Sequence, residues 1–483
     1  MMIKSLSVAP LTPPPPQSST APQKMAIPGS YGWPVIGPLS DRLQYFWFQG
    51  PVNFFKKRME KYNSTVFRTN VPPAFPFFIG VNPNVVAVLD VKSFSHLFDM
   101  ELVEKKNVLV GDFMPSVKFN GGLRVCAYLD TSETKHAQVK NLALDILARS
   151  SATWVSSMTT SLDTMWDSFD STLSTGGSAS YYLPLQQFLF TFLSRCLLGA
   201  DTSASPEVEK SGTIMLDKWL ALQLLPTISI NILQPLEEIF LHSFSYPFWL
   251  VKSDYQKLAN FVKNEAKEIL QRAQNEFKLT EEEAIHNLLF ILGFNAYGGF
   301  SLFLISLLSN LENQKNIHEE LRKEVREKIA QDVLSFETVK QMELVNSFVY
   351  ETLRLSPPVP QQFARARKDF ELSSHDAIFD IKKGELLCGY QPLVMRDPKI
   401  FENPEDFVYD RFTKKKGGNE LLNYLFWSNG PQSGTAGPSM ANKQCAARDM
   451  VPMTAAVFLA YLFQRYDEIG ISSGSITSLK KAK

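Results

Sequence analysis

The sequence predicts a single domain that is mainly α-helical with a small β region. Three observations support this fold class. Helical patterns of apolar residues dominate after about residue 130, strand-like runs are confined to residues 65–90, and no long linker divides residues 28–483. The composition, 45% hydrophobic and 20% charged, is that of a globular protein. Because 49 basic residues balance 49 acidic ones, the net charge gives no reason to expect a nucleic-acid partner.

The first 27 residues are expected to be a disordered segment that precedes the domain. Residues 1–40 contain no acidic residue, and residues 9–20 are rich in Pro, Ser and Thr, which excludes a helix there. The segment lacks both the apolar core of a secretory signal and the ~20 apolar residues of a transmembrane anchor. It resembles a plastid transit segment, which would place the protein in the chloroplast. A disordered tail without any targeting role would have the same composition.

Three short runs are expected to be strands: residues 65–69, 77–79 and 85–89. They are rich in β-branched and aromatic residues, which favour strands, and Pro and Asn separate them. These runs make up the small β region of the predicted fold.

A long helix is predicted from about residue 280. Thr280 and Glu283 have the spacing of a capping box, and residues 288–308 carry no charge. This stretch is long enough to span a membrane, but Asn, Ser and Gly interrupt it, so we favour a helix that crosses a globular core. Glycine costs ~1 kcal/mol in a helix interior. The three glycines within residues 293–299 therefore indicate either a flat or bulky group close to the backbone or close contact between helices.

A second capped helix is predicted from near Thr338, with Gln341 in its cap, to the residues before Pro357. Within it, Glu351 and Arg354 are three residues apart, so they share a face and can pair. Alone this pair is weak evidence, because such pairs are frequent on exposed helices and contribute little there.

The four cysteines, at positions 126, 196, 388 and 445, fit neither a disulfide scaffold nor a zinc or redox motif. Cys445 precedes a helical stretch at residues 446–463, and the unpaired N–H groups at a helix N-terminus favour a thiolate. A thiolate in an apolar pocket can be the proximal ligand of a haem iron. A lone cysteine is more often an inert core residue.

The order of motifs around Cys445 resembles that of the cytochrome P-450 superfamily. The Glu351–Arg354 pair is followed by Tyr409-Asp410-Arg411-Phe412 and then by a loop from Trp427 to Cys445. The resemblance covers roughly residues 28–483. It implies the cytochrome P-450 fold, with haem b (iron protoporphyrin IX) between the long central helix and the cysteine loop, and Cys445 as its axial thiolate.

The same resemblance implies roles for five further residues. Glu351, Arg354 and Arg411 would lock the cysteine loop beneath the haem. His136 and Lys140, four residues apart, resemble the aromatic/basic pair that faces a haem propionate. A solvated helix face explains His136 and Lys140 equally well.

Two departures from the general pattern point to one branch of the superfamily. Residues 293–300 contain neither an acid nor a threonine, so the proton relay with which monooxygenases activate dioxygen is missing. The cysteine loop is also longer than usual, with Ala447 where glycine is expected, and the anchor of reductase-dependent microsomal members is absent. A substrate that brings its own O–O bond needs neither relay nor reductase, and the amide of Asn295 can hydrogen-bond peroxide oxygens.

This pattern resembles the plant fatty-acid hydroperoxide branch, which includes allene oxide synthases, hydroperoxide lyases and divinyl ether synthases. The chain looks most like the 13-hydroperoxide lyases. That resemblance implies homolytic cleavage of 13-hydroperoxides of linoleic or linolenic acid, through a hemiacetal, to a C6 aldehyde and a C12 oxo acid, without dioxygen or NADPH. Divinyl ether synthase or allene oxide synthase activity is the alternative.

Three residues are expected to contact the substrate. Leu109 stands where allene oxide synthases carry Phe, and an aliphatic side chain offers no π face to a substrate radical, which favours the lyase outcome. Phe294 is expected in the pocket beside Asn295, and Lys252 is a candidate partner of the fatty-acid carboxylate. An apolar substrate also makes peripheral association with a plastid membrane an expectation. An ordinary monooxygenase and a non-catalytic haem or lipid carrier are the rivals outside the branch.

Overall fold

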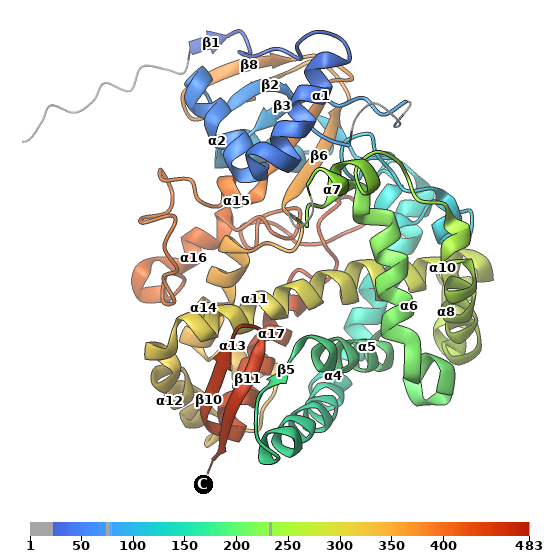
Figure 1. The fold of residues 1–483 in the computed structure, drawn as a ribbon, viewed down its shortest axis with the longest axis vertical. Coiled ribbons are helices and arrows are strands. Elements are labelled where there is room, and N and C mark those ends of the chain that lie inside the picture. The colour runs from blue at the N-terminus through green and yellow to red at the C-terminus, as the bar shows by residue number, and fades with distance from the viewer. Residues whose placement is uncertain (1–22, 74–77, 79, 231–233, 483) are drawn as a thin grey trace, which may run out of the picture.

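The computed structural model describes residues 23–73, 78, 80–230 and 234–482. It has a β-rich end, where helices α1 and α2 lie against strands, and a larger helical body (Figure 1). A long helix, formed by α10 and α11 with a π-helical segment between them, crosses the middle of that body. The predicted fold class, mainly α with a small β region, is confirmed.

The helices account for most of the described chain. Their bounds are α1 Ile36–Leu43, α2 Gly50–Tyr62, α3 Val91–Ser95, α4 Thr134–Ser174, α5 Tyr182–Leu198, α6 Pro206–Leu224, α7 Leu236–Phe240, α8 Lys252–Glu265, α9 Lys267–Asn275, α10 Glu281–Phe290, α11 Gly299–Asn313, α12 His318–Ile329, α13 Phe336–Lys340, α14 Glu343–Leu355, α15 Gln391–Val394, α16 Gly418–Leu421 and α17 Met450–Arg465. Two π-helical segments, Gln44–Phe48 and Ile291–Gly298, follow α1 and α10.

The strands form three small sheets. The largest has the order β2-β3-β9-β6-β4, and the others have the orders β1-β8-β7 and β10-β11-β5. Their bounds are β1 Gln23–Met25, β2 Val66–Asn70, β3 Asn84–Val88, β4 Val103–Glu104, β5 Ala179–Ser180, β6 Gln361–Ala366, β7 Phe370–Ser373, β8 Ala377–Ile381, β9 Leu386–Tyr390, β10 Tyr466–Ser472 and β11 Ser475–Lys481.

The strands expected at residues 65–69 and 85–89 are confirmed as β2 and β3, which pair in antiparallel register. Of the expected strand at 77–79, residues 77 and 79 lie outside the described residues, and Phe78 is in no strand. The expectation of a mainly helical pattern after about residue 130 is confirmed, but strands that the sequence analysis did not expect lie within residues 361–390 and 466–481. Some of these strands pair with distant partners, such as β9 with β3, which no local pattern reveals, whereas β7 with β8 and β10 with β11 pair as sequence neighbours.

The described fold begins before the predicted domain boundary at Pro28. Gln23–Met25 forms β1, which pairs in parallel with Ala377–Phe379 of β8, and Ile27 is buried in the main core. The part of the expected transit segment at 1–22 lies outside the described residues.

The long central helix confirms the prediction from its capping box. The Thr280 hydroxyl accepts the Glu283 N–H, and the Glu283 carboxylate accepts the Thr280 N–H at 2.8 Å. Residues 281–313 are long and apolar enough to span a membrane, but 56% of the most apolar stretch is buried inside the domain. This helix is therefore a core helix in the fold.

The glycines of this helix have different surroundings. A Cβ at Gly293 would lie 2.8 Å from both Leu216 and Trp219 of α6, and one at Gly298 would lie 3.3 Å from Leu220. Helix–helix contact, one of the two alternatives, explains these two glycines. At Gly299 the nearest atom is 4.0 Å away.

The helix predicted near Thr338 is in fact two helices. Ser335, and not Thr338, caps α13, because its hydroxyl accepts the Thr338 N–H at 3.1 Å. The N–H groups of Leu344 and Val345 in the first turn of α14 are bound by the carboxylate of Glu324 from α12. An acceptor from another helix thus replaces the local cap. As expected, α14 ends before Pro357.

Candidate haem-thiolate site

The loop that carries Cys445 is held by hydrogen bonds to the segment at residues 427–431. The Cys445 N–H donates to the Ser428 carbonyl at 2.8 Å, and Asn429, with a φ of 61°, donates to the Lys443 carbonyl at 2.8 Å. The Gln444 amide donates to the Pro431 carbonyl at 2.7 Å. These bonds hold residues 443–445, the part of the loop that leads up to the thiol.

Cys445 itself is half-buried and is a free thiol, as are the three other cysteines. Burial raises the pKa of the Cys445 thiol, while the Ala447 N–H and the positive charge of Lys140 oppose that rise. The predicted helix directly after Cys445 begins only at Met450, and residues 446–449 form a turn. The Ala447 N–H of this turn, rather than a helix terminus, therefore interacts with the sulfur.

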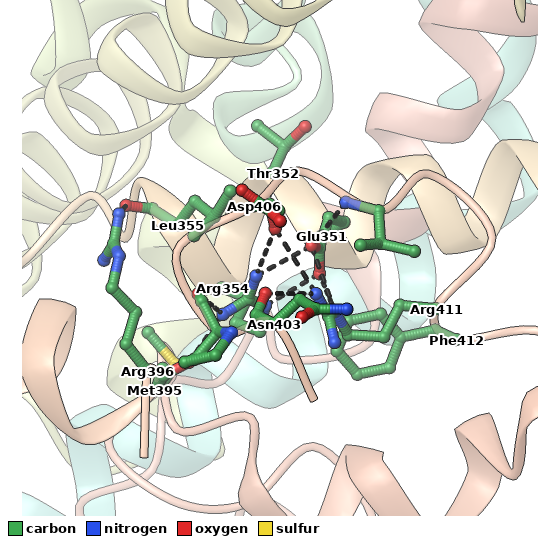
Figure 2. Close-up of polar contacts among 12 residues, drawn as sticks. Glu351, Thr352, Arg354, Leu355, Met395, Arg396, Asn403, Asp406, Arg411 and Phe412 are labelled. Carbon is green, nitrogen blue, oxygen red and sulfur yellow. Dashed lines mark hydrogen bonds and ion pairs between the residues drawn. The ribbon is translucent and has the colours of Figure 1, made fainter. Parts of the chain in front are cut away.

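Glu351, Arg354 and Arg411 form one buried ionic network, as the sequence predicted (Figure 2). Both Glu351 oxygens accept from Arg354 at 2.7 Å, and both accept from Arg411 Nε at 3.1 Å. Two guanidiniums share one carboxylate, and backbone carbonyls take up their remaining N–H groups. The acceptors include the carbonyls of Met395, Pro404 and Asp406 for Arg354, and those of Glu402, Asn403 and Asp406 for Arg411.

This network fastens the segment before the cysteine loop to α14. The Val408 N–H also donates to Glu351 at 2.9 Å, so residues 402–411 wrap around the three charged side chains. A buried charge left without a partner is strongly unfavourable, so displacing the segment from the network would be costly. The structural role expected for these three residues is consistent with this arrangement.

His136 and Lys140 lie on one face of α4, and both are buried, at 1% and 6% exposure. The alternative of a solvated helix face is therefore excluded. Lys140 donates to the carbonyl of Gln444, the residue before Cys445. The pair thus packs against the cysteine loop.

Two further lysines, which the sequence analysis missed, complete a basic cluster that we define as Lys105, His136, Lys140 and Lys443. Burial and repulsion from Lys443 lower the pKa of Lys105 to about 7. Burial, with repulsion from Lys140, lowers the pKa of Lys443 to about 8. Burial and both neighbouring lysines lower the pKa of His136 to about 4. Lys443 is only two residues before Cys445 in the sequence, and this closeness could have indicated that it lies near the thiol.

The basic cluster and the thiol together fit haem. Neighbouring lysines lower the pKa of Lys105, His136 and Lys443, and His136 Nδ1 has no hydrogen-bond partner among the described residues, so an anion beside the cluster would be favourable. A haem carries two propionates, which would supply negative charge to the basic cluster. The Cys445 thiolate could bind its iron.

Asn295 lies in the π-helical segment Ile291–Gly298 and is exposed, although Leu292, Gly293 and Tyr297 around it are buried. Phe294 is half-buried, stacks on Phe290 with ring centroids 4.6 Å apart, and packs against the main core. π-helical turns are rare and occur often at functional sites.

The remaining two predicted residues lie on different elements. Leu109 is half-buried in a tight turn, bridged to Gly111, and packs against the main core. Lys252 is exposed at the start of α8, and the hydrogen bonds and ion pairs of the described residues do not connect it to Cys445, the basic cluster or Asn295. Its assignment to the fatty-acid carboxylate stays a prediction.

The fold, the buried Glu-Arg-Arg network and the cysteine loop define a haem-thiolate protein. The family model described as Cytochrome P450 matches residues 46–467, and the chain belongs to that family. Solved cytochrome P450 structures share the fold at low identity. The retinoic acid-bound cyanobacterial CYP120A1 has a TM-score of 0.66 and 18% identity over 92% of each chain.

Curated relatives match along the whole chain. The chain is 67% identical to the chloroplastic fatty acid hydroperoxide lyase of Solanum lycopersicum, over 99% of this chain and 100% of that protein. It is 54% identical to the chloroplastic linolenate hydroperoxide lyase of Arabidopsis thaliana, over 100% of both. The chloroplastic allene oxide synthase of Linum usitatissimum is 40% identical over 97% of this chain and 88% of that protein.

Proposed function

We propose that this protein is a haem-thiolate lyase that cleaves 13-hydroperoxides of linoleic and linolenic acid. The products are a C6 aldehyde, hexanal or 3-hexenal, and a C12 oxo acid. One observation carries the proposal: the core helix exposes a neutral amide, Asn295, in a stretch without acid or threonine. The whole-chain similarity to two proteins named hydroperoxide lyases supports the same assignment.

In this proposal the cofactor is haem b. Cys445 provides the axial thiolate, and Lys105, His136, Lys140 and Lys443 provide the positive charge for the propionates. When bound, the haem iron supplies the one-electron chemistry that splits an O–O bond homolytically.

The chain's own contribution is to orient the hydroperoxide and to exclude water. Asn295 can donate from Nδ2 and accept at Oδ1, so it can hold the hydroperoxide through two hydrogen bonds without itself gaining or losing a proton. Phe294 and Leu109 are the apolar pocket residues of this proposal, and the aliphatic Leu109 offers a carbon radical of the substrate no π face that would favour its further oxidation. Lys252 remains the candidate for the carboxylate.

The reaction as proposed needs no reductase. A hemiacetal is an isomer of the hydroperoxide, and the two products together contain all its atoms, so the electrons balance without NADPH or dioxygen. Allene oxide synthases and divinyl ether synthases use the same substrates, and they remain the second candidate. The relatives named lyases are more similar to this chain than those named allene oxide synthases, and Leu109 is aliphatic, which favours the lyase.

Product analysis of the purified holoenzyme tests the proposal. With 13-hydroperoxylinolenate and no NADPH, we expect 3-hexenal and the C12 oxo acid. Ketols from a hydrolysed allene oxide, or a divinyl ether, would favour the second candidate. Binding without consumption of the hydroperoxide would contradict both and favour a carrier.

The role of Asn295 is tested by Asn295→Leu. We expect turnover to fall by about 100-fold or more, because the hydroperoxide is no longer oriented, while the haem absorption spectrum stays intact. The matched control is Asn313→Leu, since Asn313 is exposed at the far end of the same long helix. Unchanged turnover of Asn295→Leu would remove Asn295 from the mechanism.

We also propose that the protein works in the plastid and associates peripherally with its membrane. The two lyases used in the comparison are named chloroplastic. A surface next to the β-rich end presents large apolar side chains to solvent. These side chains, which we call the apolar surface, are Trp33, Ile36, Trp47 and Phe48 around α1, and Leu236, Ile239 and Phe240 of α7.

The two halves of the apolar surface are joined by buried contacts. Arg42 of α1 pairs with Glu238 of α7, and Phe46 stacks on His242 with centroids 3.7 Å apart. Isolated exposed apolar residues are ordinary, but a group of this size on adjacent elements is typical of a surface that binds protein or lipid. An apolar substrate dissolved in a membrane makes lipid the occupant we propose.

A further inference from the structure

The exposed amide of Asn295 lies two residues from Tyr297, which is 1% exposed. The Tyr297 hydroxyl donates a hydrogen bond of 2.9 Å to an oxygen of Asp217 on α6. The other Asp217 oxygen accepts from the Gln186 amide of α5 at 3.0 Å. One chain of hydrogen bonds thus links the π-helical segment to two neighbouring helices.

The face of the segment that carries Tyr297 packs tightly on α6. A side chain at Gly293, four residues before Tyr297, would collide with Leu216 and Trp219. Residues four apart share a helix face, and a residue midway between them lies on the opposite one. Asn295 therefore points away from α6, and the contacts of Tyr297 and Gly293 fix the direction in which it points.

A π-helical turn holds one residue more than an α-helical turn, so the segment has two possible registers. Relaxing it to α-helix would rotate one flank against the other by about 100°, which is the angle per residue. Such a rotation would carry a neighbouring side chain into the space that Gly293 leaves for Leu216 and Trp219, and it would also break the Tyr297–Asp217 hydrogen bond. The Tyr297–Asp217 bond is the directional contact on this face.

We infer that Tyr297, held by Asp217 and Gln186, is a positioning residue that keeps the π-helical segment in the register that presents Asn295 to the hydroperoxide. This inference rests on the proposed function of Asn295. Tyr297 acts through Asn295 and does not itself touch the substrate.

Tyr297→Phe tests the inference, because it removes the hydroxyl and keeps the buried ring. We expect kcat of the holoenzyme to fall about tenfold or more, with KM changed by less than about twofold. The same substitution in an Asn295→Ala background should cost nothing further, since the two residues act as a unit. Equal losses in both backgrounds would overturn the inference.

Two variants of Asp217 distinguish the loss of the hydrogen bond to Tyr297 from a general disturbance of the fold. Asp217→Asn keeps an acceptor for Tyr297, and the Gln186 amide can flip to match it, so activity should stay near that of the unchanged protein. Asp217→Leu removes the acceptor and should behave like Tyr297→Phe. Tyr461→Phe is the matched control, because it breaks a tyrosine–aspartate bond, to Asp163, between other helices. It should leave kcat unchanged.

Hydrogen exchange provides a readout that does not depend on the reaction. Amide protection over residues 291–298 should fall in Tyr297→Phe and Asp217→Leu and be preserved in Asp217→Asn. Unchanged protection in Tyr297→Phe would refute the inference that Tyr297 holds the register of the π-helical segment, even if the lyase reaction is confirmed. Conversely, these variants could lose protection although the unchanged protein does not cleave hydroperoxides. That result would support the positioning role of Tyr297 and refute the proposed function.

Discussion

At the scale of single residues, burial decides how much an ion pair matters to the stability of the fold. Glu351–Arg354 and Glu337–Lys340 are both ion pairs with a spacing of three residues and N–O distances of 2.7 Å. The first pair is 0% exposed on both sides, whereas the side chains of the second are 78% and 53% exposed. The sequence shows the same spacing in both, and only the packing distinguishes them.

We expect Glu351→Gln to destabilise the fold strongly, because it leaves two buried guanidiniums without a counter-charge. Removing one partner of a buried ion pair typically costs about 3–5 kcal/mol. Denaturant unfolding and the haem content of the purified protein measure the effect. Glu337→Gln, the control on a solvated face, should leave both unchanged. A small effect at Glu351, comparable to that of the control, would contradict the structural role.

Asp130 is expected to make stability depend on pH. Burial alone would raise the pKa of its carboxyl, but hydrogen bonds from Arg367, Ser132 and the Lys105 N–H hold that pKa well below its usual range. A carboxyl whose pKa is lowered by folding stabilises the fold above its unfolded pKa of about 3.9, and this contribution is lost as the pH falls below that value.

The comparison of Asp130→Asn with the unchanged protein measures this contribution. The difference between their free energies of unfolding should be constant near neutral pH and should shrink as the pH falls below about 5. Urea unfolding at a series of pH values detects it. A difference that is independent of pH would show that Asp130 does not titrate differently in the folded state.

The candidate site was only partly predictable at this scale. The spacing of Glu351 and Arg354 is a local feature of the sequence, and the resemblance to a known family indicated Arg411 and Cys445. Lys105 was not predictable, because more than 300 residues separate it from Lys443, whose charge lowers its pKa. Only the fold brings such residues together.

At the scale of helices and strands, one local cap was predicted correctly, whereas the local cap of α13 at Ser335 and the distant cap of α14 were not. The capping box of α10 lies within four consecutive residues and was found from the sequence. The first turn of α14 is capped by Glu324 from α12, so its start was missed. The π-helical segment was also missed, because the sequence pattern does not distinguish it from the α-helix on either side.

We expect Thr280→Ala to lower the free energy of unfolding by about 1 kcal/mol, since it leaves the Glu283 N–H without its acceptor. Thr280→Ser keeps the hydroxyl and should restore the stability. Chemical denaturation monitored by far-UV circular dichroism distinguishes the variants. If serine and alanine proved equally destabilising, the loss would come from packing of the threonine methyl group and not from the cap.

At the scale of the whole molecule, the apolar surface around α1 and α7 is the feature that the sequence analysis did not anticipate. Its members come from residues 33–48 and 236–240, which lie about 200 residues apart in the sequence. They meet only because α7 packs on α1 through the buried Arg42–Glu238 pair.

We expect the double variant Ile36→Glu, Phe240→Glu to bind phosphatidylcholine vesicles at least about tenfold more weakly than the unchanged protein. Burying one large apolar side chain contributes about 1.5–3 kcal/mol, and each 1.4 kcal/mol is a factor of ten in affinity. Co-sedimentation with vesicles, with and without phosphatidylglycerol, measures the binding. Val333→Glu is the control, because Val333 is 74% exposed but lies between α12 and α13. Equal loss in both variants would exclude the apolar surface as the lipid contact.

The parallel pairing of β1 with β8 limits how far proteolytic maturation can trim this chain. Lys24 of β1 bridges Glu371 and Asp380 across the sheet, and β1 covers the outer side of β8. A peptidase that cut after Ile27 would strip this strand and leave the N–H and C=O groups of β8 open to pairing with another molecule. A cut at or before residue 22 would keep β1 in place and that sheet margin closed.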